Sequence, residues 1–389
     1  MKILGSNVIM YFKLLFLNFV HILSYIFSPF RDKMTWIFGS WDGKSFLDNS
    51  KYLFLFVNHY FPQINAVWIS KDKSLVEELR KRGYKAFYDR ELRAIYYYLR
   101  AGYYIIDHVP LYGGLTSPLN LWLSGGAKII QLWHGIPFKR IDRIPQVRRK
   151  VTVLKKILSW FSVVNLVNSR INMYVVAPSE FIGKILTSAF RVPEKHLILA
   201  DYTRNYFYML PVEIRTLNLD LYNKVKTLKE SGKKIIFYIP TFRDTGGNPF
   251  TKGVIDVKKL IEVLKNNDAI MIVKFHKADI ENVDARSFEC EQIIFLKDDD
   301  IYELLQFCDI LITDYSSIFY DFLFLDRPIV FFPYDLKKYT TIDRELYFDY
   351  HSFVPGPICH TFEESVSYTH LEPTRPLYIS YAVFCLKKK

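Results

Sequence analysis

The sequence predicts an α/β protein with two doubly wound domains facing a central cleft. From about residue 35 onward, short runs rich in β-branched and aromatic residues alternate with helical patterns. The series restarts after a polar stretch near residues 211–232. Such alternation produces parallel sheets with helices on both faces. Ligands of such domains bind at the carboxyl ends of the strands, so the functional residues are expected there.

The first series is expected to form an N-terminal Rossmann-like domain over residues 35–210. Two segments, residues 73–82 and 90–100, combine helical periodicity with charge. Buried strands are expected at residues 35–41, 66–70, 103–107, 128–133 and 173–177.

The second series is expected to form a C-terminal Rossmann-like domain over residues 211–365. Its helices are expected at residues 257–265, 301–307 and 318–325. Its strands are expected at residues 234–239, 269–275, 293–296, 310–313 and 328–332.

The composition narrows the class of protein. Half of the 389 residues are hydrophobic and 17% are aromatic, which excludes an intrinsically disordered chain. Cys290, Cys308 and Cys359 are scattered without a CxxC pair, so neither a disulfide framework nor a zinc site is expected, in keeping with a reducing cytoplasm. The formal charge of +12 favours a membrane surface, an anionic substrate or nucleic acid as partner. No nucleic-acid-binding module is recognisable, and nucleic acid is not expected.

Residues 1–34 are expected to form a membrane-associating segment. Residues 8–27 are almost entirely apolar, and about twenty helical residues suffice to cross a bilayer. Lys13 and His21 are costly at the bilayer centre, so a helix that lies in the membrane interface is an alternative to a helix that spans the membrane. A buried first helix is a further alternative, and a cleaved signal peptide is disfavoured because no small-x-small site precedes Pro29. Arg31 and Lys33 favour the cytoplasmic side for the rest of the chain.

The last residues, 366–389, look foreign to the rest. They read VSYTHLEPTRPLYISYAVFCLKKK, which resembles two translated pieces of a sequencing adapter. We therefore expect a read-through segment there and a C-terminal domain that is truncated; the alternative is a genuine amphipathic tail.

A basic amphipathic segment interrupts the first series. Within residues 139–164, cations stand beside apolar residues in a pattern typical of helices that bind anionic membranes. The alternative is the solvated face of a core helix. The residues expected to face the membrane are Arg148, Arg149, Lys150, Lys155, Lys156 and Trp160.

The first chemical motif is QLWHGIPFK. An expected strand leads into His134, and Gly135 and Pro137 then force a loop that ends near Lys139. Histidine titrates near neutral pH, so an imidazole at the end of a strand can accept the proton of an attacking hydroxyl. A structural histidine is the alternative.

Two further motifs follow strands of the second series. YIPTFRD delivers Thr241 and Arg243 to a loop, and these are donors that suit a phosphate. The motif KFHK places His276 directly after an expected strand, in the same way that His134 follows a strand of the first series.

The longest motif is LITDYSSIFYDF. Ser316 and Ser317 lie between a strand and a helix, where the helix N-terminus can face a phosphate; simple helix capping is the alternative. Asp314 and Asp321 are expected to support this loop, and Asp314 is also a candidate for the phosphate site. Residues 298–300 are aspartates that are interpreted as a helix cap rather than a metal site.

These motifs, in this order and with PIVFFPYDLKKY and YFDYHSFVPGPI after them, closely resemble the CDP-glycerol glycerophosphotransferase family of teichoic-acid and capsule synthesis. The resemblance covers residues 36–358. It implies a GT-B fold with an N-terminal acceptor domain, a C-terminal nucleotide domain and peripheral attachment to the membrane. By length the chain looks like the primase type. Lys277 stands where family members commonly have proline, and the segment DYTRNY at residues 201–206 departs from the family pattern.

The resemblance implies transfer of a polyol phosphate from CDP-glycerol or CDP-ribitol to a polyprenyl-diphosphate-linked saccharide, with release of CMP at the cytoplasmic face of the membrane. No cofactor is expected. His134 would be the base, and His276 would assist the phosphate or the leaving group. Thr241, Arg243, Ser316 and Ser317 would hold the diphosphate. The alternatives are a GT-B glycosyltransferase that uses a nucleotide sugar and a catalytically degenerate assembly subunit at the membrane.

Overall fold

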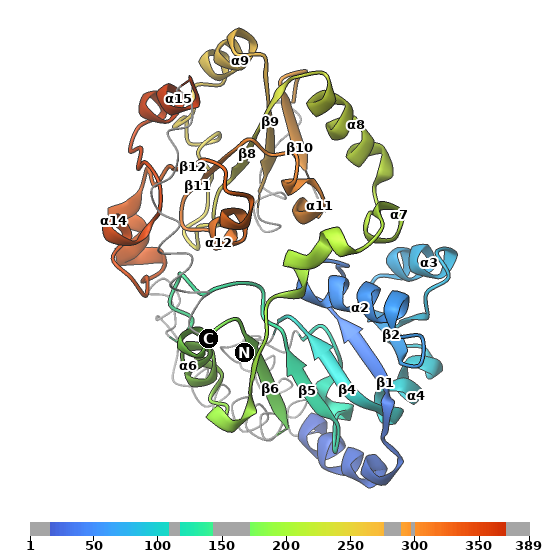
Figure 1. The fold of residues 1–389 in the computed structure, drawn as a ribbon. Helices are drawn as coiled ribbons and strands as arrows, with labels where there is room; N and C mark the ends of the chain where they lie inside the picture. Colours follow the sequence, from blue (N-terminus) through green and yellow to red (C-terminus); the bar gives the residue numbers. More distant parts are fainter. Residues whose placement is uncertain (1–15, 109–116, 143–171, 276–288, 297–299, 371–389) are drawn as a thin grey trace, which may run out of the picture. The chain divides into compact units, whose positions relative to one another are not determined.

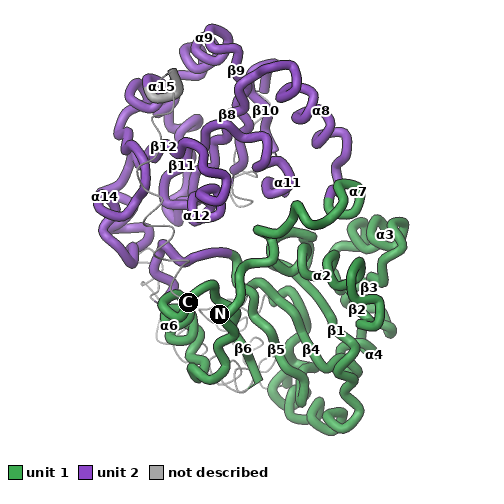
Figure 2. The backbone as a smooth tube through the Cα atoms, in the orientation of Figure 1, with its two compact units in different colours: residues 1–134, 151–215 green, residues 135–150, 216–389 purple. Residues whose placement is uncertain are grey.

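A computed structural model describes residues 16–108, 117–142, 172–275, 289–296 and 300–370. The chain forms two compact units (Figure 2). Unit 1 comprises residues 1–134 and 151–215, and unit 2 comprises residues 135–150 and 216–389. The first boundary between the two units along the chain thus lies between His134 and Gly135, inside the motif QLWHGIPFK. Each unit is built on its own parallel sheet (Figure 1), so the α/β class with parallel sheets is confirmed.

Unit 1 contains a sheet with the strand order β3-β2-β1-β4-β5-β6-β7. Every neighbouring pair in it runs parallel. Its strands are β1 (Asp32–Gly39), β2 (Asn65–Ser70), β3 (Ala86–Tyr88), β4 (Ala101–Ile106), β5 (Lys128–Gln131), β6 (Met173–Ala177) and β7 (Leu197–Leu199). The chain winds outward from β1 in one direction and then from β4 in the other, so the order reverses between these two strands.

Two helices of unit 1 begin at a side-chain cap. Asp72 accepts backbone N–H bonds at the start of α3 (Lys73–Lys81), and Ser179 does so at α6 (Glu180–Phe190). The other helical elements are η1 (Tyr25–Phe30), α2 (Asp48–Tyr60), α4 (Leu92–Arg100), η2 (Leu121–Leu123), η4 (Glu194–His196), η5 (Thr203–Met209) and α7 (Val212–Arg215). Residues 16–24 are also helical.

Unit 2 contains a sheet with the strand order β10-β9-β8-β11-β12, again parallel throughout. Its strands are β8 (Lys234–Ile239), β9 (Ala269–Lys274), β10 (Ile293–Leu296), β11 (Ile310–Thr313) and β12 (Ile329–Phe331). The order reverses between β8 and β11. Its helical elements are α8 (Leu219–Glu230), α9 (Val257–Asn266), α11 (Ile301–Leu305), α12 (Ile318–Phe322), η7 (Leu323–Leu325), α13 (Leu336–Lys338), η8 (Tyr339–Asp343), α14 (Tyr350–Phe353) and α15 (Phe362–His370).

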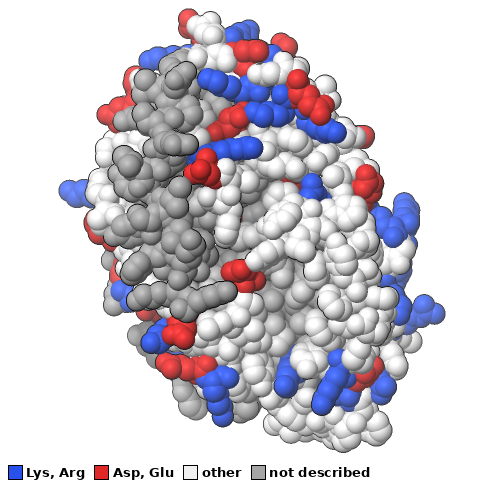
Figure 3. Space-filling model, viewed as in Figure 1, with Lys and Arg blue, Asp and Glu red and all other residues white. Residues whose placement is uncertain are grey.

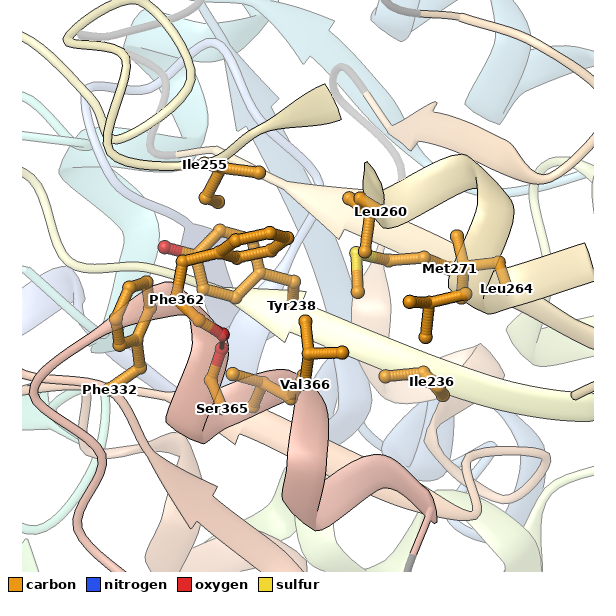
Figure 4. A pocket seen from close by; sticks show the side chains of 12 residues that line it. Ile236, Tyr238, Ile255, Leu260, Leu264, Met271, Phe332, Phe362, Ser365 and Val366 are labelled. Atoms are coloured by element: carbon orange, nitrogen blue, oxygen red, sulfur yellow. Dashed lines mark hydrogen bonds between the residues drawn. The ribbon is translucent and has the colours of Figure 1, made fainter. Parts of the chain in front are cut away.

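An apolar cavity of about 30 Å³ lies in the core of unit 2. Ile236 of β8, Met271 of β9 and Leu264 of α9 line it together with Phe362 and Val366 of α15 (Figure 4). The only polar side chains in its wall are Tyr238 and Ser365. The cavity therefore belongs to the packing of α9 and α15 on the sheet and offers nothing that would bind an anionic donor.

The two ends of the chain are described in part. Among the described residues, no helix combines the length and the apolar character that a membrane span requires. At the other end, α15 includes residues 366–370, the start of the segment expected to be foreign, whereas residues 371–389 lie outside the described ranges. The described ranges also exclude the residues expected to face a membrane, which are Arg148, Arg149, Lys150, Lys155, Lys156 and Trp160.

Candidate functional site

In unit 1, the carboxyl ends of three adjacent strands deliver aromatic and titratable side chains. Trp41 follows β1, Asp107 and His108 follow β4, and His134 follows β5. Because β1 and β4 flank the point where the strand order reverses, this edge of the sheet is where an open α/β domain binds its ligand. The sequence predicted His134 here, and the structure adds the other three residues.

His134 is half-buried, and its tautomer is fixed by the backbone. Its Nδ1 lies 3.1 Å from the carbonyl oxygen of Asp107. A carbonyl oxygen only accepts, so Nδ1 carries the proton and donates it, and Nε2 keeps the lone pair that a general base needs. The preceding Trp133 has φ 57°, a left-handed conformation that costs free energy in a bulky residue and turns the chain toward Gly135.

The rings of Trp41 and His108 form a cluster with this imidazole. The ring centroids of Trp41 and His134 are 5.4 Å apart with planes at 29°, and those of Trp41 and His108 are 6.0 Å apart with planes at 7°. The two imidazoles are 5.8 Å apart. Within the described residues, Nδ1 of His108 is buried without a hydrogen-bond partner, and burial lowers the pKa of His108.

Asp107 is the buried centre of this cluster. Its carboxylate oxygens accept hydrogen bonds from the Trp41 backbone N–H at 2.9 Å and from the Ser40 hydroxyl at 2.7 Å. Burial, followed by the proximity of Asp48, raises the pKa of Asp107 to about 8. Asp107 thus contacts Trp41 through its carboxyl group and the candidate base His134 through its carbonyl oxygen.

The segment DYTRNY, residues 201–206, is hydrogen-bonded to residues next to this cluster. Arg204 donates to Asp48 at 2.7 Å in an ion pair that is almost completely buried. Asn49, next to Asp48, accepts from the Arg204 backbone N–H at 3.1 Å and donates to the Trp133 carbonyl oxygen at 2.8 Å. Arg204 therefore stabilises the turn that carries His134, a structural role that sequence reasoning did not assign.

In unit 2, Arg243 is the centre of a saturated ionic cluster after β8. Its guanidinium donates to Asp314 at 2.6 Å, to Asp335 at 2.8 and 3.1 Å and to the Thr241 carbonyl oxygen at 2.5 Å. The side chain is 1% exposed. Burial opposes its charge, but Asp314 and Asp335 more than offset this, so the pKa of Arg243 is raised.

Aromatic rings complete the enclosure of Arg243. The guanidinium carbon lies 5.0 Å from the ring centroids of Tyr315 and Tyr334 and 5.3 Å from that of Tyr339. Arg243 was expected to bind the diphosphate directly. In this structure its guanidinium is directed at two carboxylates and a carbonyl oxygen.

The remaining predicted residues of unit 2 gather around this cluster after β11. Asp314 accepts from the Thr241 backbone N–H at 2.8 Å, so the ends of β8 and β11 are joined at the point where the strand order reverses. The Thr241 hydroxyl is buried with no hydrogen-bond partner among the described residues. Ser316 and Ser317 are partly exposed at the start of α12, and the Ile318 N–H reaches the Ser316 hydroxyl only at 3.5 Å.

Two other expectations concern helix caps and supports. Asp321 is buried in α12 and accepts from the hydroxyl of Tyr302 in α11 at 2.8 Å. Asp300 caps α11 by accepting from the Tyr302 N–H at 3.0 Å, as the sequence predicted for the aspartates at residues 298–300.

Lys139 belongs to unit 2 through a short β-bridge. It pairs with Leu346, and the flanking bonds are Arg140 N–H to the Glu345 carbonyl oxygen at 2.8 Å and Tyr347 N–H to the Phe138 carbonyl oxygen at 3.0 Å. Burial and the nearby Arg344 cation lower the pKa of Lys139 to about 8. Arg344 is in turn bound to Asp244 at 2.6 Å.

The structure thus brings Thr241, Arg243, Asp314, Ser316 and Ser317 to one edge of the second sheet and places His134 at the corresponding edge of the first. His276 lies outside the described residues. Within the described ranges, no group of three or more His, Cys, Asp or Glu side chains is arranged to hold a metal ion. Sequence reasoning missed Asp335 and Arg344, although both stand in charged stretches downstream of an expected strand.

Comparison with known proteins identifies the family that this chain matches. Residues 21–371 match the family model described as CDP-glycerol:poly(glycerophosphate) glycerophosphotransferase. The teichoic acid poly(glycerol phosphate) polymerase of Bacillus subtilis strain 168 is 30% identical over 86% of this chain and 43% of its own length. The polymerase of the same description from Bacillus spizizenii strain W23 is 28% identical over 94% of this chain and 90% of its own length.

A solved structure shares the fold. The wall teichoic acid polymerase TagF superposes with a TM-score of 0.71 at 23% identity, covering 98% of this chain and 92% of that one. The chain spans less than half of the Bacillus subtilis relative, 43% of its length.

Proposed function

This chain belongs to the CDP-glycerol:poly(glycerophosphate) glycerophosphotransferase family, as its motifs indicated, and on that premise we propose that it transfers a polyol phosphate from a CDP-activated donor. Glycerol phosphate is the first choice because the relatives named above are poly(glycerol phosphate) polymerases, and ribitol phosphate is the second. The proposed acceptor is a hydroxyl of a membrane-bound, polyprenyl-linked saccharide, and the proposed pathway is teichoic-acid or capsule synthesis.

The observation that carries the proposal is the fixed tautomer of His134 at the carboxyl edge of its sheet. With Nδ1 bound to the Asp107 carbonyl oxygen, Nε2 takes the proton of the acceptor hydroxyl. The acceptor oxygen then bonds to the phosphorus that carries the polyol. The bond from that phosphorus to the bridging oxygen breaks, and CMP leaves with the electron pair.

The donor side is proposed to lie in unit 2. The Thr241 hydroxyl, buried and without a partner among the described residues, together with Ser316 and Ser317, supplies donors for the diphosphate. Arg243 and Asp314 hold the Thr241 loop in place through the bonds described above. His276 keeps its proposed role beside the phosphate or the leaving group.

Attachment to the cytoplasmic face of the membrane is proposed to use residues 16–30. Two polar side chains of this segment face the protein: His21 is 4% exposed and contacts the Trp122 carbonyl oxygen at 3.3 Å, and Ser24 accepts from the Gly125 N–H at 2.9 Å. The apolar side chains face outward, among them Phe19 at 57%, Ile22 at 62% and Ile26 at 66% exposure. This is the reverse of a soluble helix and suits the bilayer interface.

The surface around this segment fits the same role. Figure 3 shows an uncharged face over the N-terminal residues with Lys and Arg side chains beside it. Arg100 is exposed and donates to the Phe30 carbonyl oxygen at 2.9 Å, and Lys33 is exposed as well. Cations next to an apolar ridge attract anionic headgroups. Ile22→Ser with Ile26→Ser should reduce sedimentation with anionic vesicles, whereas Leu92→Ser, at an exposed apolar residue outside this segment, should not.

The experiment that tests the function is a donor screen. CDP-glycerol, CDP-ribitol and UDP-sugars are offered with a polyprenyl-linked acceptor in vesicles, and nucleotide release is measured. We expect CMP release and a product whose mass contains a new phosphodiester. A glycosidic product from a UDP-sugar would make the chain a glycosyltransferase. Binding of CDP-glycerol by calorimetry without CMP release would make it a degenerate assembly subunit.

A further inference from the structure

Trp41 occupies an unusual position for a large aromatic residue. It follows β1 at the reversal point of the first sheet and has φ 49°, in the left-handed region that bulky residues avoid. The conformation is held by the hydrogen bond from its N–H to the buried Asp107 carboxyl group at 2.9 Å. A strained residue fixed by a buried partner beside a candidate base indicates a function for the side chain.

The indole of Trp41 faces the imidazole of His134. Their centroids are 5.4 Å apart with planes at 29°, within the range in which a cation is attracted by an aromatic face. Trp133 contacts the same imidazole at 3.9 Å between centroids, but its ring also packs edge-on against Phe190 in the core. Trp41 is partly exposed and stacks on both His134 and His108.

We propose that Trp41 is a positioning residue for His134, whose indole fixes the imidazole plane and stabilises the imidazolium formed when His134 accepts the acceptor proton. This inference rests on the proposed function, in which His134 is the base. The neutral imidazole gains only stacking from the indole, whereas the imidazolium gains the attraction of a cation for the ring quadrupole. The interaction is therefore stronger after proton transfer than before it, which is the condition for an effect on kcat.

Asp107 connects the backbone of Trp41 to the side chain of His134. Its carboxyl group holds the Trp41 N–H, and its carbonyl oxygen accepts from Nδ1 of His134 at 3.1 Å. One residue of the strand end therefore sets the distance between the indole and the imidazole.

Other titratable groups also face this pair. They are Asp107 itself, His108 at 5.8 Å from the imidazole of His134, Asp42, which acts on His108, and the Asp48–Arg204 pair behind the turn. An aromatic face adds stabilisation of the imidazolium without adding a charge that would bind a phosphate.

The test compares Trp41→Leu with Trp41→Phe. Trp36→Leu is the matched control, because Trp36 lies on β1, the strand that Trp41 follows, but its ring meets Tyr103 at an interplanar angle of 55° and its indole N–H donates to the Lys33 carbonyl oxygen. Thermal unfolding of each variant comes first and establishes that it is folded. CMP release with CDP-glycerol is then measured as a function of pH and of each substrate concentration.

We expect Trp41→Leu to lower kcat about threefold to thirtyfold. The donor KM should stay unchanged, and the acid limb of the pH profile should move to lower pH. Trp41→Phe should restore part of the loss, and Trp36→Leu should behave like the wild type. An unchanged pH profile, or a loss confined to the KM of the acceptor, would overturn the proposal and make Trp41 a substrate-binding surface.

A second measurement separates this inference from the proposed function. The imidazole of His134 is followed by NMR titration of histidine-labelled protein, assigned with His134→Gln. A lower titration midpoint in Trp41→Leu supports the stacking even if wild-type protein releases no CMP, in which case only the proposed function fails. An equal midpoint in both proteins overturns the inference whatever the activity.

Discussion

The surroundings of His134 and of Arg243 occupy equivalent places in the two units and are built in opposite ways. Both follow a strand at the carboxyl edge of a parallel sheet: Arg243 follows β8, which borders the reversal of strand order, and His134 follows β5, one strand away from it. His134 is surrounded by rings and by a backbone carbonyl oxygen, and its neighbour His108 keeps a buried nitrogen without a partner among the described residues. Arg243 is bound by two carboxylates and a carbonyl oxygen under three tyrosine rings.

The difference separates two tasks. A group that exchanges a proton needs a nitrogen whose charge can change at low cost, and neutral aromatic neighbours provide that setting. A loop that presents donors to a diphosphate needs a fixed shape, and paired buried charges provide it because either partner alone is costly. Four changes would break or sharpen this contrast.

The largest effect is expected from Arg243→Met. It leaves Asp314 and Asp335 buried without their cation, which typically destabilises a protein by about 3–5 kcal/mol. The free energy of unfolding from urea denaturation measures it. Lys226→Met, which breaks the exposed pair with Glu230, is the control and should change stability by about 0.5 kcal/mol or less. A loss below about 1 kcal/mol for Arg243→Met would mean that the cluster is not preorganised.

His134→Gln should reduce CMP release about a hundredfold or more without a comparable loss of stability. His196→Gln is a matched control. His196 also places Nδ1 next to a backbone carbonyl oxygen, that of Met173 at 3.0 Å, and stacks on Tyr174, but Met173 begins its strand, so this contact lies at the amino edge of the sheet. Near-normal turnover of His134→Gln would remove the base from the proposed mechanism.

The next prediction concerns the pH dependence of stability. The folded pKa of Asp107 is raised to about 8, above the usual carboxyl value of about 4. Between these values the native state binds a proton that the unfolded state has released, so this group makes stability fall as pH rises, by up to about 1.4 kcal/mol per pH unit. Asp107→Asn should flatten the fall between pH 6 and pH 8 in denaturation experiments. An equally steep fall in the variant would assign it to other groups.

The smallest effect is expected from Lys139. Its folded pKa is lowered to about 8, so part of the population lacks the proton at that pH. A bound diphosphate favours the ammonium form, and donor binding at pH 8 should therefore take up a fraction of a proton. Calorimetry in two buffers of different ionisation enthalpy measures this uptake. Lys139→Met should abolish it, and Lys252→Met serves as a comparison because burial also lowers the pKa of Lys252.

The sequence predicted the regular part of the fold well where the pattern is local. Strands β6, β8, β10 and β11 have the expected bounds, because each is a continuous apolar run bordered by polar residues. The short strands β3 and β7 were missed, since three residues carry too little periodicity. Helix α2 was missed as well, because its segment DNSKYLFLFVNHY contains an apolar run that helices and strands share.

For the candidate site, the sequence predicted residues but not their partners. His134, Thr241 and Asp314 were found because each follows a recognisable strand. Asp335 and Trp41 were not found. Asp335 contacts Arg243 across 92 residues of sequence, and Trp41 contacts His134 by ring stacking, and neither contact leaves a local pattern in the sequence. An arginine after a strand suits a phosphate and a carboxylate equally, and only the fold shows which of them Arg243 faces.

Because Trp41 stacks on His134, its fluorescence should depend on the protonation state of that histidine. An imidazolium quenches the fluorescence of an indole in contact with it, whereas a neutral imidazole does so weakly. The emission of Trp41 should therefore report the protonation of His134 directly, without a label. In a chain with six tryptophans, the difference between the wild type and Trp41→Phe isolates that signal.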